Sequence, residues 1–115
     1  MRKDLLGWQW ARYAPGHRDR MSLLLHIVTV PLFWVGTTMV LWAILSGSAG
    51  AAVSGLALSL AALLAQGQGH GREAERPVAF DGPFDFVSRF FVEQFITFPR
   101  FVLSGGWLKA WRDAA

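Results

Sequence analysis

The chain has 115 residues, which fits a single domain, and 53% of them are hydrophobic while only 17% are charged. Soluble domains are charged at about a quarter of their residues, so this composition argues against an ordinary soluble domain. The net charge is +3, and the basic residues are scattered among aromatic residues, which argues against nucleic-acid binding and favours binding to anionic lipid headgroups. The absence of cysteine excludes disulfides and thiolate metal ligands.

The first segment, residues 1–20, is polar and basic, with Trp8, Trp10 and Tyr13 interleaved. Tryptophan and tyrosine suit the headgroup layer of a membrane because each has an apolar body and a polar tip. We therefore expect a short interfacial helix over roughly residues 4–14, which the following Pro-Gly pair ends.

No charged residue lies within residues 21–71, and this stretch contains two apolar runs. The first run, residues 21–46, predicts a helix about 39 Å long, which can cross the ~30 Å hydrocarbon core of a bilayer with some tilt. Asp19 is the expected N-cap, with Ser22 as the alternative, and Pro31 is a candidate kink. The run is too long for the core of a signal peptide, so we expect it to be retained.

A short uncharged turn leads to the second apolar run, residues 51–65, and the two runs predict a helical hairpin. Gly47, Ala51 and Gly55 recur every four residues, which places small side chains on one face and favours close packing of the two helices. The stretch that follows, residues 66–83, is polar and rich in glycine, and it predicts a loop.

Residues 84–103 predict an amphipathic helix in which Asp85, Arg89 and Glu93 form a narrow charged stripe among phenylalanine, valine and isoleucine. We expect this helix to lie in the membrane interface or to pack on the end of the hairpin, because charges in its middle disfavour a third crossing. Pro99 is expected to kink or end it, and a last short interfacial turn follows.

Lysine and arginine are confined to the two ends of the chain, and the turn between the apolar runs has none. The positive-inside rule therefore places both termini in the cytoplasm, and we expect a bacterial-type inner membrane. Together the elements predict an all-α fold, in which a membrane helical hairpin carries flanking interfacial amphipathic helices within one membrane-embedded domain, residues 1–115.

The three histidines flank the start of the first predicted membrane helix and the end of the second. A hairpin brings those two ends together, so His17, His26 and His70 are expected to gather at its cytoplasmic end, with Glu73 nearby. His17 and His26 can meet only if the helix begins after His17, because nine residues at ~100° each would place them on opposite faces. Histidines with a carboxylate suit non-haem iron or another first-row divalent ion. The alternative is a solvated His17, a His26 bonded to a neighbouring helix and a His70 in a flexible loop.

Three short motifs resemble those of a small membrane family, the 2-hydroxy fatty acid dioxygenases first linked to phytosphingosine breakdown in yeast. The first motif pairs two histidines nine residues apart with a following proline, as in His17, His26 and Pro31. The second and third motifs resemble Gln66-Gly67-Gln68-Gly69-His70 and Glu73 followed by Arg76-Pro77-Val78-Ala79-Phe80. Two features differ: Asp19 and Ser22 stand where the family has asparagine, and Glu73 follows His70 by three residues instead of four.

The resemblance implies a multi-helix membrane fold, an Fe(II) cofactor and α-oxidation by dioxygen of a 2-hydroxy fatty acid to an acid one carbon shorter. It makes Glu73 a candidate iron ligand or a group that orients a histidine, beside the three candidate ligands His17, His26 and His70. Arg76 and Arg100 are candidate partners for the substrate carboxylate, because a guanidinium can pair both of its oxygens.

Two other hypotheses stay open from the sequence. One is a non-enzymatic small membrane protein with a structural or lipid-packing role, and the other is a divergent relative that keeps the fold but has lost the metal. Bound iron distinguishes the enzyme from both of them, while the number of subunits is left open.

Overall fold

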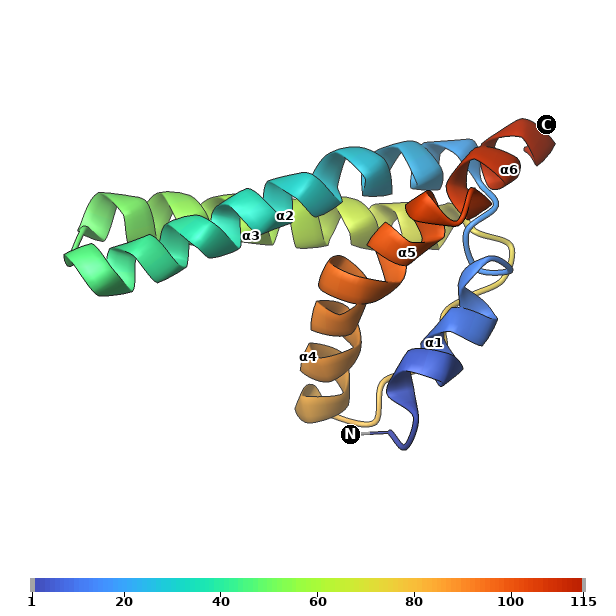
Figure 1. Ribbon diagram of the computed structural model, residues 1–115, viewed down its shortest axis with the longest axis horizontal. Coiled ribbons are helices and arrows are strands. Elements are labelled where there is room, and N and C mark those ends of the chain that lie inside the picture. The colour runs from blue at the N-terminus through green and yellow to red at the C-terminus, as the bar shows by residue number, and fades with distance from the viewer. Residues whose placement is uncertain (1, 115) are drawn as a thin grey trace.

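The computed structural model describes residues 2–114, and these residues contain helices and no β-strand, which confirms the predicted all-α class. Figure 1 shows a long antiparallel hairpin whose one end carries the shorter helices. In chain order the elements are α1 (Leu5–Tyr13), α2 (Arg20–Ser46), α3 (Ala49–Arg72), α4 (Pro83–Val92), the π-helix η1 (Glu93–Thr97), α5 (Phe98–Leu103) and α6 (Gly106–Asp113).

The ends of α2 follow from local capping. The side chain of Asp19 accepts a hydrogen bond of 2.9 Å from the backbone N–H of Ser22, which confirms the predicted N-cap. Helix α2 runs without interruption through Pro31 and ends at Gly47, whose φ of 71° lies in the left-handed region that favours glycine. Because α2 begins after His17, that residue is free to fold back toward the helix.

Helix α3 is longer than the sequence pattern predicts. It extends from Ala49 to Arg72, so the expectation of a loop from residue 66 onward was wrong as far as residue 72. Gln66 and Gly69 are buried in this last part of the helix, and a Cβ at Gly69 would lie 3.1 Å from the hydroxyl oxygen of Ser22. Packing against α2 therefore overrides the weak helix propensity of the glycine-rich stretch.

Close approach of the two helices occurs at a pair of glycines. A Cβ at Gly55 would lie 2.7 Å from the carbonyl oxygen of Gly36, and a Cβ at Gly36 would lie 2.9 Å from that of Gly55. The predicted role of Gly55 in helix packing thus holds, whereas Gly47 caps α2 in the turn, where a Cβ would meet no neighbouring atom within 4 Å. Both α2 and α3 are long and apolar enough to cross a membrane.

The segment from α4 to α5 crosses the hairpin instead of running along it (Figure 1). It is anchored by the ring of Phe33, whose centroid lies 4.9 Å from that of Phe90 and 5.5 Å from that of Phe91. The predicted single helix over residues 84–103 is interrupted by η1, and Pro99 lies in the first turn of α5 instead of ending the helix. A compact core at this end of the hairpin is formed by Tyr13, Leu23, Val30, Phe98 and Phe101.

Candidate metal centre

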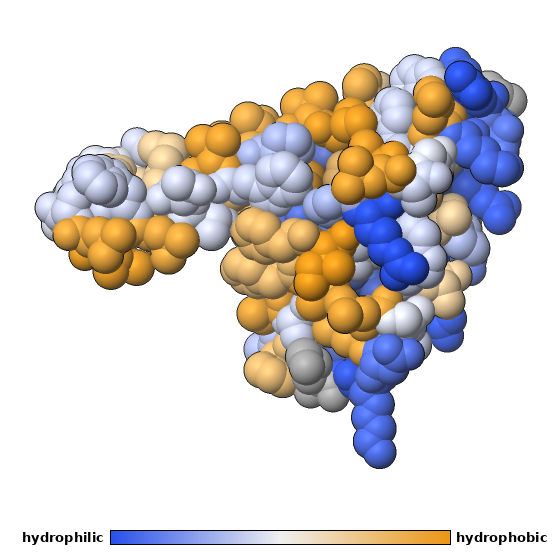
Figure 2. All heavy atoms as spheres, in the orientation of Figure 1, coloured by the Kyte–Doolittle hydropathy of each residue, from blue (hydrophilic) through white to orange (hydrophobic). Residues whose placement is uncertain are grey.

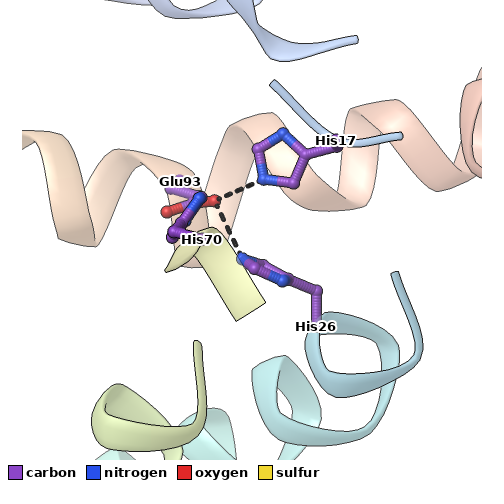
Figure 3. A group of neighbouring side chains, drawn as sticks. All are labelled: His17, His26, His70 and Glu93. Carbon is purple, nitrogen blue, oxygen red and sulfur yellow. Dashed lines mark ion pairs between the residues drawn. The ribbon is translucent and has the colours of Figure 1, made fainter. Parts of the chain in front are cut away.

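Four side chains from four separate segments converge at this end of the hairpin, as Figure 3 shows. His17 belongs to the loop between α1 and α2, His26 to α2, His70 to α3 and Glu93 to η1. One potential ligand atom from each lies within 4.8 Å of those of the other three. The predicted meeting of the three histidines therefore occurs, and a carboxylate that the sequence analysis placed elsewhere joins them.

Hydrogen bonds fix the ring orientation of two of the histidines. The Nδ1 atom of His17 lies 2.7 Å from the carbonyl oxygen of Tyr13, and Nδ1 of His26 lies 2.8 Å from that of Ser22. A carbonyl oxygen only accepts, so each Nδ1 carries the hydrogen and donates it. In the neutral rings this leaves a lone pair on each Nε2, which is the arrangement that metal-bound histidines use.

Both of these Nε2 atoms are buried and have no hydrogen-bond partner among the described residues 2–114. They face the Oε2 atom of Glu93 at 3.5 Å for His17 and 3.6 Å for His26. An unsatisfied buried acceptor costs about 1–3 kcal/mol, so three electron-rich atoms directed at one point are a poor arrangement unless a cation lies between them. The residues present therefore fit a bound metal ion.

Glu93 is held in place by Tyr13, whose hydroxyl donates a hydrogen bond of 2.8 Å to Oε2. The Tyr13 ring also stacks on the His17 ring, with centroids 3.8 Å apart. Burial raises the pKa of Glu93, whereas contact with the rings of His17 and His26 in their protonated, hydrogen-bond-donating form lowers that pKa well below its ordinary value. Burial, followed by the charge of Glu93, raises the pKa of Tyr13, so Tyr13 stays a hydrogen-bond donor.

The π-helix explains how the carboxylate reaches the site. Glu93, Gln94 and Thr97 are all buried within this single π turn, which is a local irregularity that occurs frequently at functional sites. The amides of Gln94 and Gln66 exchange two hydrogen bonds, of 2.6 and 3.0 Å, which tie η1 to α3. Trp34 of α2 donates a further bond of 2.7 Å to the carbonyl of Gln94.

Glu73 does not join the four converging side chains. One of its carboxylate oxygens accepts hydrogen bonds from the backbone N–H groups of Arg18, at 2.8 Å, and Asp19, at 3.0 Å. Glu73 therefore fastens the loop that carries His17 to the end of α3. Its contribution to the site is to position the loop, and the acidic position of the cluster belongs to Glu93.

The donor set limits which ions fit. Three imidazoles and one carboxylate suit first-row divalent metals, among them the iron of non-haem oxygenases, and disfavour Mg²⁺ and Ca²⁺, which prefer oxygen ligands. His17, His26 and Glu93 would supply ligands from buried positions, and His70 would do so from a half-buried one.

A cavity of about 580 Å³ opens beside the cluster. Tyr13, His17, His70 and Glu93 form part of its wall, so a molecule in the cavity would lie next to the convergent ligand atoms. This volume falls in the range typical of small-molecule sites. The rest of the wall combines apolar and aromatic side chains with polar and charged ones. The apolar members are Trp8, Leu63, Pro77, Val78, Phe80, Phe86 and Phe90, and the others are Gln9, Arg12, Gly16, Gln66, Gly67, Glu75, Arg76 and Arg89.

The two arginines predicted to bind a carboxylate lie in different places. Arg76 lines the cavity, whereas the guanidinium of Arg100 lies 4.1 Å from the ring centroid of Trp10 and is not part of the cavity wall. The guanidinium of Arg89 donates a hydrogen bond of 3.2 Å to the carboxylate of Asp85, its neighbour in the charged stripe. It donates a second hydrogen bond, of 2.7 Å, to the backbone carbonyl oxygen of Val78. It thus holds the loop that covers the cavity.

Sequence reasoning missed Glu93 and Tyr13 as site residues. Glu93 was assigned to the charged stripe of an amphipathic helix and Tyr13 to the membrane interface. An acidic residue within an apolar helix is itself a signal of function, because burying its charge is costly without a partner.

Comparisons of the chain with protein-family models, with curated proteins and with solved structures give no match. The site therefore has to be interpreted from its own chemistry.

Proposed function

We propose that the chain is a membrane-embedded, Fe(II)-dependent dioxygenase that shortens a 2-hydroxy fatty acid by one carbon. The observation that carries this proposal is the convergence of three imidazoles and Glu93, with the Nε2 atoms of His17 and His26 buried and unpaired. The motifs that resemble the 2-hydroxy fatty acid dioxygenase family give the reaction and the substrate. The two apolar helices support a membrane location, with the site at one end of the hairpin.

Each part of the site has a role in this proposal. His17, His26, His70 and Glu93 would hold the iron, which supplies the redox chemistry with dioxygen. Tyr13 keeps Glu93 oriented through its hydroxyl. Arg76 would bind the substrate carboxylate at the polar end of the cavity, and the phenylalanine side chains of the wall would hold the alkyl chain.

Metal analysis of the detergent-purified protein tests the first step. After loading with Fe(II) under anaerobic conditions, the wild-type protein should hold one iron per chain, and His26→Ala should hold none. Glu75→Gln is the matched control, because Glu75 is an exposed carboxylate outside the cluster, and it should keep the iron. Absence of iron from the wild-type protein would favour a structural or lipid-packing protein, or a relative that has lost the metal.

Turnover tests the second step. The iron-loaded protein should convert a 2-hydroxy fatty acid and dioxygen to the acid one carbon shorter, CO2 and water, with the shortened acid measured by mass spectrometry. Iron binding without this product would show that the substrate is wrong while the metal site stands.

A further inference from the structure

The buried and exposed faces of α4 are the reverse of those of a helix on a soluble protein. Its charged residues Asp85 and Arg89 are each only 7% exposed, whereas Phe84 is 66%, Val87 48% and Phe91 43% exposed. A surface helix in water places its charges outward and its apolar side chains inward. Along η1, the same outward apolar face is continued by Phe95 and Ile96.

This apolar face is continuous with the hairpin. Figure 2 shows hydrophobic side chains in the inner corner between the hairpin and the segment that crosses it, while the strongly hydrophilic side chains lie along the side away from this corner, from the upper right to the bottom of the view. All the lysines and arginines lie outside residues 21–71, so the projecting part of the hairpin is free of them. The corner therefore has the character of a surface that faces lipid.

Distances along the hairpin set the depth of α4. The segment crosses α2 at Phe33, and 13 residues from there to Ser46 make about 20 Å of helix. It crosses α3 at Gln66, and 17 residues from there to Ala49 make about 25 Å. Both lengths are shorter than the ~30 Å hydrocarbon core.

The backbone at Gly47 and Ser48, between α2 and α3, is not helical. Its polar groups therefore need hydrogen-bond partners outside the hydrocarbon core and must lie in the far headgroup layer. The hydrocarbon core therefore extends about 5–10 Å beyond the crossing point, toward the near headgroup layer. That is the depth at which an interfacial amphipathic helix lies in the headgroup–acyl boundary.

We infer that α4 and η1 form a lipid-binding surface that lies in the near boundary of the bilayer, with acyl chains covering Phe84, Val87, Phe91, Phe95 and Ile96. This inference rests on the membrane location in the proposed function and adds the depth and orientation of the site. Phe86 and Phe90 of α4 line the cavity, so an amphiphile dissolved in the membrane reaches the apolar wall without crossing water. The bilayer plane then runs along α4 and across the hairpin.

The absence of cysteine from the chain allows a direct test by single-cysteine labelling. Phe84→Cys and Phe91→Cys would each carry a fluorescent label in vesicles of phosphatidylethanolamine and phosphatidylglycerol. Leu56→Cys, on the exposed surface of α3, is the control for the hydrocarbon core, and Lys109→Cys, whose position on α6 is exposed at the charged end of the molecule, is the control for water.

Quenchers attached to a shallow acyl carbon should quench the labels at positions 84 and 91 several-fold more strongly than iodide does, and iodide should quench the label at position 109 more strongly. Iodide quenching at 84 and 91 equal to that at 109, with the label at 56 protected, would overturn the inference and leave the membrane location intact. Iodide access at position 56 would instead refute the membrane location. Protection at 84 and 91 from both quenchers that disappears on dilution into excess lipid would assign the surface to a second copy of the chain, against the inference.

Discussion

Replacing Glu93 by glutamine should remove metal binding and, at a pH high enough for the rings of His17 and His26 to be neutral, should stabilise the metal-free protein. In the wild-type protein Oε2 of Glu93 faces the Nε2 atoms of His17 and His26 at 3.5 and 3.6 Å, and none of the three carries a hydrogen when the rings are neutral. A glutamine amide has two hydrogens to donate to these acceptors, and the hydroxyl of Tyr13 can pair with either end of the amide.

The size of both effects follows from these contacts. Satisfying one orphaned buried acceptor removes a penalty of about 1–3 kcal/mol, which is the expected gain in the free energy of unfolding of the metal-free variant. Loss of a group that only orients a ligand weakens metal binding about 10–100-fold, so loss of the anionic ligand itself should cost at least about 100-fold, or roughly 2.7 kcal/mol.

The assay compares wild type, Glu93→Gln and Glu73→Gln in the same detergent. Iron affinity is measured by competition with a chelator, and stability is measured by denaturant unfolding with chelator present. Glu73→Gln should lose stability and weaken iron binding by no more than about 10–100-fold, because it weakens the bonds to the N–H groups of Arg18 and Asp19 that position the loop of His17. Iron affinity of Glu93→Gln equal to that of wild type would show that Glu93 is not a ligand. A metal-free variant less stable than wild type at a pH where both rings are neutral would show that the Nε2 atoms carry no unsatisfied acceptor.

Three further predictions concern packing, ligand orientation and acid stability. Gly55→Ala should destabilise the hairpin by about 1–3 kcal/mol in denaturant unfolding, because its Cβ would lie 2.7 Å from the carbonyl oxygen of Gly36; unchanged stability would contradict this packing. Tyr13→Phe keeps the ring on His17 but removes the bond to the carboxylate, so iron affinity should fall about 10–100-fold with an unchanged circular dichroism spectrum. The backbone N–H of Asp81 and the Arg89 guanidinium lower the pKa of Asp85 in the folded protein, so its stabilising effect is complete above about pH 4 and is lost as the pH falls through that lowered pKa. Asp85→Asn should therefore flatten the fall in stability below about pH 4, and a profile identical to that of wild type would argue against this linkage.

The hairpin and the meeting of the histidines could be predicted because they depend on properties local in sequence. The uncharged runs determine two long helices, Asp19 determines where α2 begins, and an antiparallel pair necessarily brings His26 and His70 to one end. The end of α3 was misplaced because its polar, glycine-rich sequence resembles a loop, while burial of Gln66 and Gly69 against α2 keeps it helical.

The fourth member of the cluster could not be predicted because it depends on tertiary contacts. Glu73 was chosen for its closeness to His70 in sequence, but at the end of α3 its side chain meets the loop before α2 instead. Glu93 reaches the site only because the helical segment crosses the hairpin at Phe33 and widens into a π turn, and neither feature follows from residue periodicity. Arg100 was chosen for its charge, and it stacks on Trp10 away from the cavity.

The π turn also constrains the length of the chain at this point. Asp85, Arg89, Glu93, Thr97 and Phe101 are all buried at four-residue steps. In a regular α-helix each such step advances by about 40°, so over these residues the row would drift roughly 160° around the axis, and the wider turn takes back part of that rotation. Removing one residue from η1 would rotate α5 by about 100° and carry Phe98 and Phe101 away from Tyr13. Homologous chains that share this site should therefore tolerate substitutions in the turn more readily than a change in its number of residues.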